Sequence, residues 1–353
     1  MPKPDSFEGA YSVLEHFLHR IALGPRSVRA ASFDVEQSFV KPDPGLIGDG
    51  RHVFIAGLAR AGTTVLLQAL HGTGHFRSLT YREMPFVLMP NLWRRLSPGG
   101  HKIELLRERA HGDGLLVNYD SPEAFEEVFW KTFTQVDYLL VDRLIPHTVG
   151  NDVIRKFRSY IAAILASPGE QDLLYLSKNN NNILRLAAIR QAFPMAVILV
   201  PFRHPVPHAL SLLEQHSRFG ALHTPRSFLH DYMTWLGHHE FGSTHRPFAF
   251  QPGDIERMQR YDPNSAEYWL AAWIGAYRHL IDNSAGALFI SHETICEAPG
   301  PILRALSGLT GHDLATTDAI ATFRPSRPAS RAIADSPLLE EALELHAQLL
   351  ART

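Results

Sequence analysis

Short apolar segments alternate with helix-like segments along most of the chain, and this alternation constrains the fold more than any other feature. The apolar segments are HVFIA, LLYLS, AVILVPF and ALFIS, and each is followed by a stretch with helical periodicity. Strands joined through helices in this way form a parallel sheet, because the crossovers are right-handed and place helices on both faces. We therefore expect an α/β fold with three layers, α/β/α, around a parallel sheet core.

The length and the loop composition suggest how the chain is divided. With 353 residues, 45% of them hydrophobic, the chain can bury a large core. A helical pattern near the N-terminus is separated from the first apolar segment by the loop KPDPGLIGDG. We predict an N-terminal helical appendage at 1–47 and a single domain at 48–353. Within it, 76–170 and 218–264 are expected to be helical insertions that form the walls or lid of a site.

Charge and cysteine content exclude several classes of protein. The formal net charge of −2 gives no indication of a nucleic-acid-binding surface. The single cysteine, Cys296, leaves no partner for an intrachain disulfide and no Cys-rich zinc site, which fits a reducing compartment. No apolar stretch reaches ~18 residues, so we expect no membrane span. These observations predict a cytoplasmic protein without a bound metal.

The segment GLARAGTT, residues 57–64, has the glycine spacing of a phosphate-binding loop between a strand and a helix. Backbone N–H groups and a helix N-terminus then face an anion. The usual lysine is replaced by Thr63, and a positive charge stands within the loop at Arg60. That lysine contacts the β- and γ-phosphates of ATP or GTP, so its loss argues against nucleoside-triphosphate hydrolysis. A sulfuryl group, with less charge, can be held by amides, hydroxyls and one cation without a metal.

Four segments together resemble the sulfotransferases that use 3′-phosphoadenosine 5′-phosphosulfate (PAPS). The loop ARAGTT is similar to the family pattern P-[KR]-[SA]-G-T-T, with Ala59 in place of the proline. The strand AVILVPF ends before Arg203, and Ser211 follows eight residues later, as in the family's 3′-phosphate signature. SKNNNNILRL resembles a segment of the carbohydrate- and tyrosine-sulfating branches, with Asn180 where proline is usual, and FISHE resembles the late strand that ends in Glu.

This resemblance implies an activity and a set of site residues. The activity is transfer of a sulfuryl group from PAPS to a hydroxyl or amine acceptor. Arg203 and Ser211 would bind the 3′-phosphate. Of the arginines in FRPSRPASR, Arg327 is the candidate for closing over the nucleotide. The 5′-phosphosulfate would be held by Arg60, Ala61, Gly62, Thr63 and Thr64.

The transfer also needs a base that removes the acceptor proton. Glu83, in TYREMPFVL, lies 23 residues after Arg60, about where several sugar- and tyrosine-sulfating branches carry their catalytic glutamate. We expect burial in a partly dry pocket to raise the pKa of Glu83 toward neutrality. His75 and His111 are the substitutes, because some branches use histidine.

Other readings of the chain stay open. Lys178 is either a site residue or an exposed strand-end lysine. The segment YLLVD is similar to a Walker B strand, but it lies in a largely helical insertion, so we interpret Asp142 as a structural or surface acid. The alternatives to a sulfotransferase are a small-molecule kinase that uses ATP and a degenerate member that binds the nucleotide without turnover. No sequence motif indicates whether the acceptor is a small molecule, a carbohydrate or a peptide. The oligomeric state is also open.

Overall fold

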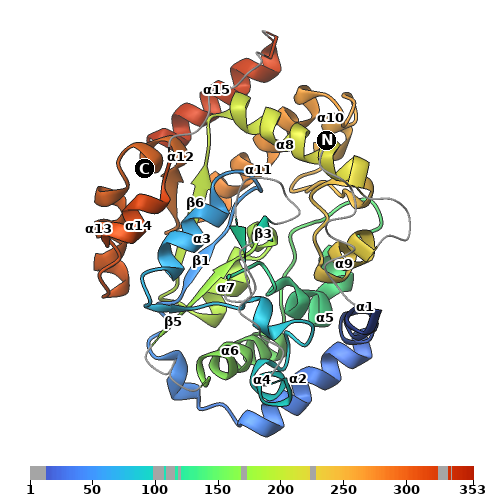
Figure 1. The fold of residues 1–353 in the computed structure, drawn as a ribbon. Helices are drawn as coiled ribbons and strands as arrows, with labels where there is room; N and C mark the ends of the chain where they lie inside the picture. The colour runs from blue at the N-terminus through green and yellow to red at the C-terminus, as the bar shows by residue number, and fades with distance from the viewer. Residues whose placement is uncertain are drawn as a thin grey trace.

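A parallel sheet of five strands forms the centre of the protein (Figure 1). Its spatial order is β2 (Phe76–Arg77), β5 (Leu174–Lys178), β1 (Val53–Ile55), β6 (Val197–Phe202) and β7 (Leu288–Ser291), and every pairing is parallel. The four expected strands are confirmed, and the edge strand β2 is an addition. The structure, a computed structural model, describes residues 13–97, 107–108, 116–117, 121–167, 173–222, 228–324, 333–334 and 336–353.

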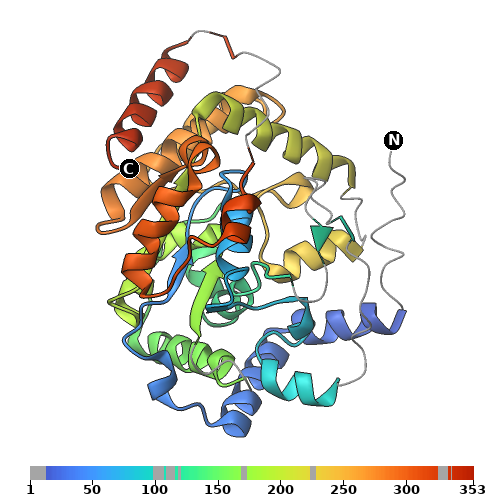
Figure 2. The ribbon, with the colours of Figure 1, turned by 60° about the vertical axis from the view of Figure 1, so that its left-hand side comes forward.

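Helices cover both faces of the sheet and complete the three-layer architecture (Figures 1 and 2). The side chains of β1 alternate between the faces: Val53 and Ile55 belong to one buried apolar cluster, and Phe54 belongs to the other. The first cluster includes side chains of α3 (Thr63–His71), α12 (His292–Glu297), α13 (Pro299–Thr310) and α14 (Thr317–Thr322). The second includes α6 (Asn151–Leu165), α7 (Leu186–Ala192), α8 (Pro205–Leu222), α11 (Ala266–Asn283) and α15 (Pro337–Leu350).

The N-terminal segment contains α1 (Val13–Leu23), α2 (Arg26–Val40) and η3 (Pro44–Ile47), and α2 packs closely on the rest of the protein. Phe33 is buried against Phe129, with ring centroids 6.1 Å apart. Glu36 is fully buried and accepts hydrogen bonds from the backbone N–H and side-chain amide of Asn91, at 2.9 and 2.8 Å. These contacts tie α2 to the first insertion, and the domain boundary at residue 47 stays a prediction.

The two insertions are largely helical where the structure describes them. The first contains η4 (Tyr81–Glu83), α4 (Pro90–Leu96), the short strands β3 (Arg107–Glu108) and β4 (Leu116–Val117), and α5 (Glu127–Tyr138). The second contains α9 (Phe228–Leu236), η6 (Gly242–Thr244) and α10 (Asp254–Met258). Between β5 and α7 lies η5 (Asn180–Leu184). Across the described ranges, every helix is too short or too polar to cross a membrane.

The segment YLLVD does not belong to the sheet. Tyr138 ends α5, and the Asp142 side chain, 60% exposed, pairs with neighbouring Arg143 at 3.1 Å. The interpretation of Asp142 as a surface acid is confirmed. A Walker B motif requires a strand, and YLLVD does not form one.

Candidate active site

The loop at 57–62 leaves the central strand β1 and enters α3, so it lies at the edge where the parallel strands end. Gly62 has φ +86°, and a Cβ there would lie 2.5 Å from Nδ1 of His292. Both the left-handed backbone and the approach of the imidazole require glycine. Arg60 also has a positive φ, +68°, a conformation that costs energy for a residue with a Cβ. The expected strand, loop and helix are all present.

Helix α8 holds this loop through two side chains. The Arg60 Nε–H donates to the Ser211 hydroxyl oxygen at 3.1 Å, over a sequence separation of 151 residues. The His208 Nε2–H donates to the Ala59 carbonyl oxygen at 2.8 Å from a fully buried ring. These bonds fix the loop against α8, and they bring together two of the predicted donor-binding residues, Arg60 and Ser211.

The buried His208 makes the stability of the protein sensitive to acid. Burial lowers the pKa of His208 to about 3, with smaller effects of nearby positive charges. The unfolded chain therefore binds a proton below about pH 6.5 that the folded chain excludes, so the stabilisation is complete above about pH 6.5 and decreases as the pH falls toward 3. Burial likewise lowers the pKa of His52, His147, His239 and His245 to between about 3 and about 4.

We expect the free energy of unfolding to fall on acidification from about pH 6.5 to about pH 5, by up to roughly 1.4 kcal/mol per pH unit for each such histidine. His208→Gln keeps a donor for Ala59 but does not titrate, so urea unfolding of this variant should show a shallower slope. An unchanged slope would show that His208 does not contribute to the acid sensitivity.

Arg203 follows β6 directly, and its surroundings indicate an anion site. Its Nε lies 4.0 Å from a carboxylate oxygen of Glu293, which accepts the His204 backbone N–H at 3.0 Å. The Arg203 side chain is 14% exposed, burial lowers the pKa of its guanidinium, and Nε has no hydrogen-bond partner. A largely buried guanidinium with an unsatisfied N–H fits a ligand that supplies anionic oxygens.

The loop opens into a pocket with a cavity volume of about 190 Å³. Three positive side chains line it: Arg60, Arg203 and Lys178, the last residue of β5. Loop residues and both insertions complete the wall, as the sequence predicted for the insertions. The other lining residues are Ala59, Gly62, Thr63, Thr64, Val65, Glu123, Asn180, Met233, His238, Glu240, Phe241 and His292.

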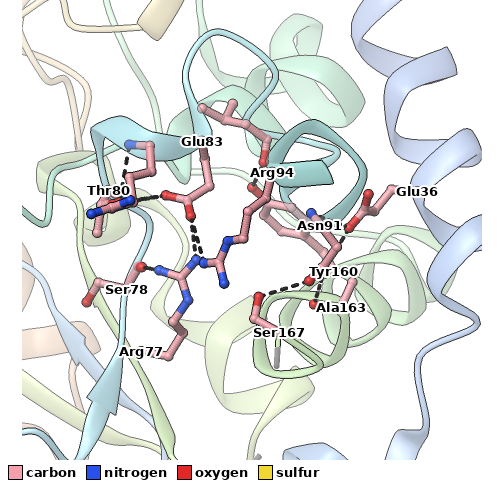
Figure 3. Close-up of polar contacts among 12 residues, drawn as sticks. Glu36, Arg77, Ser78, Thr80, Glu83, Asn91, Arg94, Tyr160, Ala163 and Ser167 are labelled. Atoms are coloured by element: carbon pink, nitrogen blue, oxygen red, sulfur yellow. Dashed lines mark hydrogen bonds and ion pairs between the residues drawn. The ribbon is translucent and has the colours of Figure 1, made fainter. Parts of the chain in front are cut away.

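Glu83 does not line this pocket, and its contacts are those of a buried structural carboxylate (Figure 3). It is 1% exposed, and one oxygen lies 2.5 Å from Arg77 Nη2 and 3.5 Å from Arg94. The other oxygen accepts the N–H and the hydroxyl of Thr80, at 2.6 and 2.9 Å. Burial alone would raise the pKa of Glu83, but the Arg77 charge and the Thr80 hydrogen bonds bring it below its usual value. The expected rise in pKa is wrong, and the role of base stays a prediction.

Of the substitute bases and the late arginine, only His75 lies in the described part of the chain, and it does not line the pocket. The His75 carbonyl accepts the Leu174 N–H at the start of β5, so His75 lies at the edge where the strands begin, opposite the loop. Its ring stacks on that of His312, with centroids 4.7 Å apart. His111 and Arg327 lie outside the described residues.

Several pocket residues were missed by the sequence interpretation. His292 stands in the quoted FISHE segment, but nothing in the sequence indicates that its ring reaches Gly62. Glu240 belongs to the second insertion and Glu123 to the first, and no motif marks them. Within the described parts of the chain, no group of three or more His, Cys, Asp or Glu side chains could hold a metal ion.

Comparison with known proteins agrees with this architecture. The chain matches the Sulfotransferase family over residues 52–255, more than half of its length. The chain therefore belongs to the sulfotransferase family. A search among curated proteins gives no match.

One solved structure shares the fold at low identity, and a second is similar to a lesser degree. Sulfotransferase STF9 from Mycobacterium avium has a TM-score of 0.52 and 15% identity, with 95% of this chain and 83% of that chain covered. Sulfotransferase STF1 from Mycobacterium tuberculosis H37Rv has a TM-score of 0.48 and 15% identity, with coverage of 91% and 83%. These likenesses concern the arrangement of the sheet and helices.

Proposed function

We propose that the protein transfers the sulfuryl group of PAPS to a hydroxyl or amine of a small-molecule, carbohydrate or peptide acceptor. The observation that carries this proposal is the buried Arg203 Nε without a hydrogen-bond partner, in a pocket shared with the loop at 57–62. A second phosphate on the nucleotide, at the ribose 3′ position, is the group that would satisfy this guanidinium.

The residues around the pocket divide into donor-binding roles. The backbone N–H groups from Ala61 to Thr64, where the loop enters α3, would hold the 5′-phosphosulfate, with the Thr63 and Thr64 hydroxyls beside them. The Ala61 N–H makes only a long bond, of 3.4 Å, to the Leu58 carbonyl oxygen. Arg203 would bind the 3′-phosphate together with Ser211 of α8, whose hydroxyl oxygen accepts the Arg60 Nε–H in this structure. PAPS supplies the activated sulfuryl group when bound.

Two side chains would act on charge that develops during transfer. Arg60 would stabilise negative charge on the oxygen that bridges phosphate and sulfate, because its loop and Ser211 fix its position before the reaction. Lys178 is only 9% exposed, and it comes from the strand next to β1, whose Ile55 it opposes in the sheet. Its position supports a site role for Lys178 in preference to that of an exposed strand-end lysine.

The pocket argues against the kinase, but it does not separate an enzyme from a binding protein without turnover. A kinase needs a cation at the lysine position of the loop and an acid for magnesium. Thr63 occupies the first position, and Asp142, the candidate for the second, is exposed and paired with Arg143. A binding protein without turnover would share every donor-binding contact, so only a rate separates it from an enzyme.

The test is transfer of radiolabelled sulfate from PAPS to panels of phenols, alcohols, amines, sugars and tyrosine peptides, with a metal chelator present. We expect labelled product in at least one panel, and no transfer from radiolabelled ATP with magnesium. Transfer from ATP alone would establish a kinase, and bound PAPS that is never consumed would establish a binding protein.

A further inference from the structure

Glu240 presents a carboxylate to the same pocket as the loop and Lys178. It lies after α9 and is half-buried. Its Oε1 accepts the Asn180 side-chain N–H at 2.8 Å, across 60 residues of sequence. Among the described residues, no side chain or backbone group makes a hydrogen bond to its other oxygen, Oε2. One oxygen is therefore held in place while the other can accept a proton from a ligand.

The asparagine run at 179–182 explains why Glu240 lies there. Asn181 Nδ2 donates to the Gly237 carbonyl oxygen at 3.3 Å, and Asn179 Nδ2 donates to Glu127 Oε2 at 2.7 Å. These buried amides attach the 237–240 segment and α5 to the end of β5, next to Lys178. Through these bonds the asparagine run fixes the segment that brings Glu240 to the wall of the pocket.

Asn180, which lines the pocket, also has an unused acceptor. The residue is 6% exposed, and its Oδ1 is buried without a hydrogen-bond partner. A buried amide oxygen in this state costs free energy unless a ligand donates to it. The hydroxyl or amine N–H of an acceptor is such a donor, so this oxygen indicates that the acceptor binds beside Glu240.

The other proton acceptors of the pocket are less suitable. Glu123 Oε1 accepts the backbone N–H of the adjacent Ala124 at 3.0 Å. Nε2 of His238 lies 3.3 Å from the carbonyl oxygen of Ala124. His292 packs against Gly62, and burial lowers its pKa. Glu123 is bonded within its own segment, whereas Glu240 is held by Asn180, a buried amide with a second, unsatisfied acceptor.

We propose that Glu240 is the base of the sulfuryl transfer and that Asn180 positions it; the proposal rests on the proposed function. The acceptor O–H gives its proton to Glu240 Oε2 as the acceptor oxygen bonds to sulfur. The bond from sulfur to the bridging phosphate oxygen breaks, and its electron pair leaves with 3′,5′-adenosine bisphosphate. Water in place of the acceptor gives inorganic sulfate by the same steps.

The charged groups facing this pocket set the pH dependence of the step. The positive groups come from the loop and from β5 and β6, and the titratable ones come from the two insertions and α12. They are Arg60, Lys178, Arg203, Glu123, His238 and His292.

The experiment measures consumption of radiolabelled PAPS with the acceptor of highest turnover, or with water if no acceptor is found. We expect Glu240→Gln to lower turnover by about 10²–10⁴-fold, the span of general-base catalysis, and to bind bisphosphate like the wild type. Asn180→Ala should move the acidic limb of the rate–pH profile to higher pH, because a hydrogen bond to a carboxylate favours its charged form. A merely structural role for Asn180 would leave that limb in place.

Glu256→Gln, on the exposed side of α10, is the matched control and should keep the wild-type rate. Full activity of Glu240→Gln together with loss of activity in Glu83→Gln would overturn the proposal and assign the base to Glu83. Consumption of no PAPS by a wild type that binds bisphosphate would also contradict a base in this pocket. Failure of the wild type to bind bisphosphate would instead contradict the proposed function.

Discussion

Replacing Arg60 by alanine should lower kcat by about 10²–10³-fold while leaving the affinity for 3′,5′-adenosine bisphosphate nearly unchanged. The magnitude is that of removing one preorganised donor from a developing negative charge. Arg60 fits such a role because its left-handed backbone and the Ser211 hydrogen bond fix the guanidinium at the pocket before any ligand binds. Steady-state kinetics and calorimetric titration with the bisphosphate measure the two quantities separately.

A matched variant separates charge from position in this prediction. Ser211→Ala removes the acceptor of the Arg60 hydrogen bond but keeps the charge, so its loss in kcat should be smaller than that of Arg60→Ala. If Arg60→Ala weakens bisphosphate binding as much as it lowers the rate, then Arg60 is a ligand of the ground state and the assignment to developing charge is wrong.

Replacing Arg185 by alanine should destabilise the protein by about 3–5 kcal/mol, because it leaves a buried carboxylate without its counter-ion. Arg185 is 1% exposed and forms two bonds to Glu127, of 2.7 and 3.1 Å. Its guanidinium also lies over the rings of Trp130 and Tyr138, 4.9 and 4.7 Å from their centroids. Urea unfolding followed by circular dichroism measures the loss.

The control for Arg185 is Arg155→Ala, which removes an exposed ion pair with Asp152 one helical turn away and should leave the unfolding midpoint unchanged. The double variant Arg185→Met with Glu127→Gln should recover part of the lost stability, because it removes both buried charges. A midpoint for Arg185→Ala equal to that of the wild type would contradict the role of this pair.

The sequence predicted the elements whose signals are local. The apolar segments became β1, β5, β6 and β7, because each run of buried residues is long enough for a strand and is followed by a helix. The loop was also readable, since its glycines are needed at fixed offsets from the strand. The edge strand β2 was not predicted, because two residues, Phe76 and Arg77, carry too little pattern.

The candidate site was less predictable, because its contacts join distant residues. Glu83 was placed from its offset along the chain, whereas the local signal Thr80-x-x-Glu83 describes a capping box, which the structure contains. That box and Arg77 hold the carboxylate away from the lining of the pocket. The Asn180–Glu240 contact spans 60 residues and has no periodic or motif signal, so only the folded chain shows it.

The most direct test of the central claim is thermal unfolding with 3′,5′-adenosine bisphosphate in the absence of magnesium. We expect the ligand to raise the melting temperature, with about 2.7 kcal/mol of added stability at ~100 times its dissociation constant, and Arg203→Ala to remove most of this shift. Stabilisation by magnesium and ATP, with no response to the bisphosphate, would contradict the assignment of the pocket to PAPS.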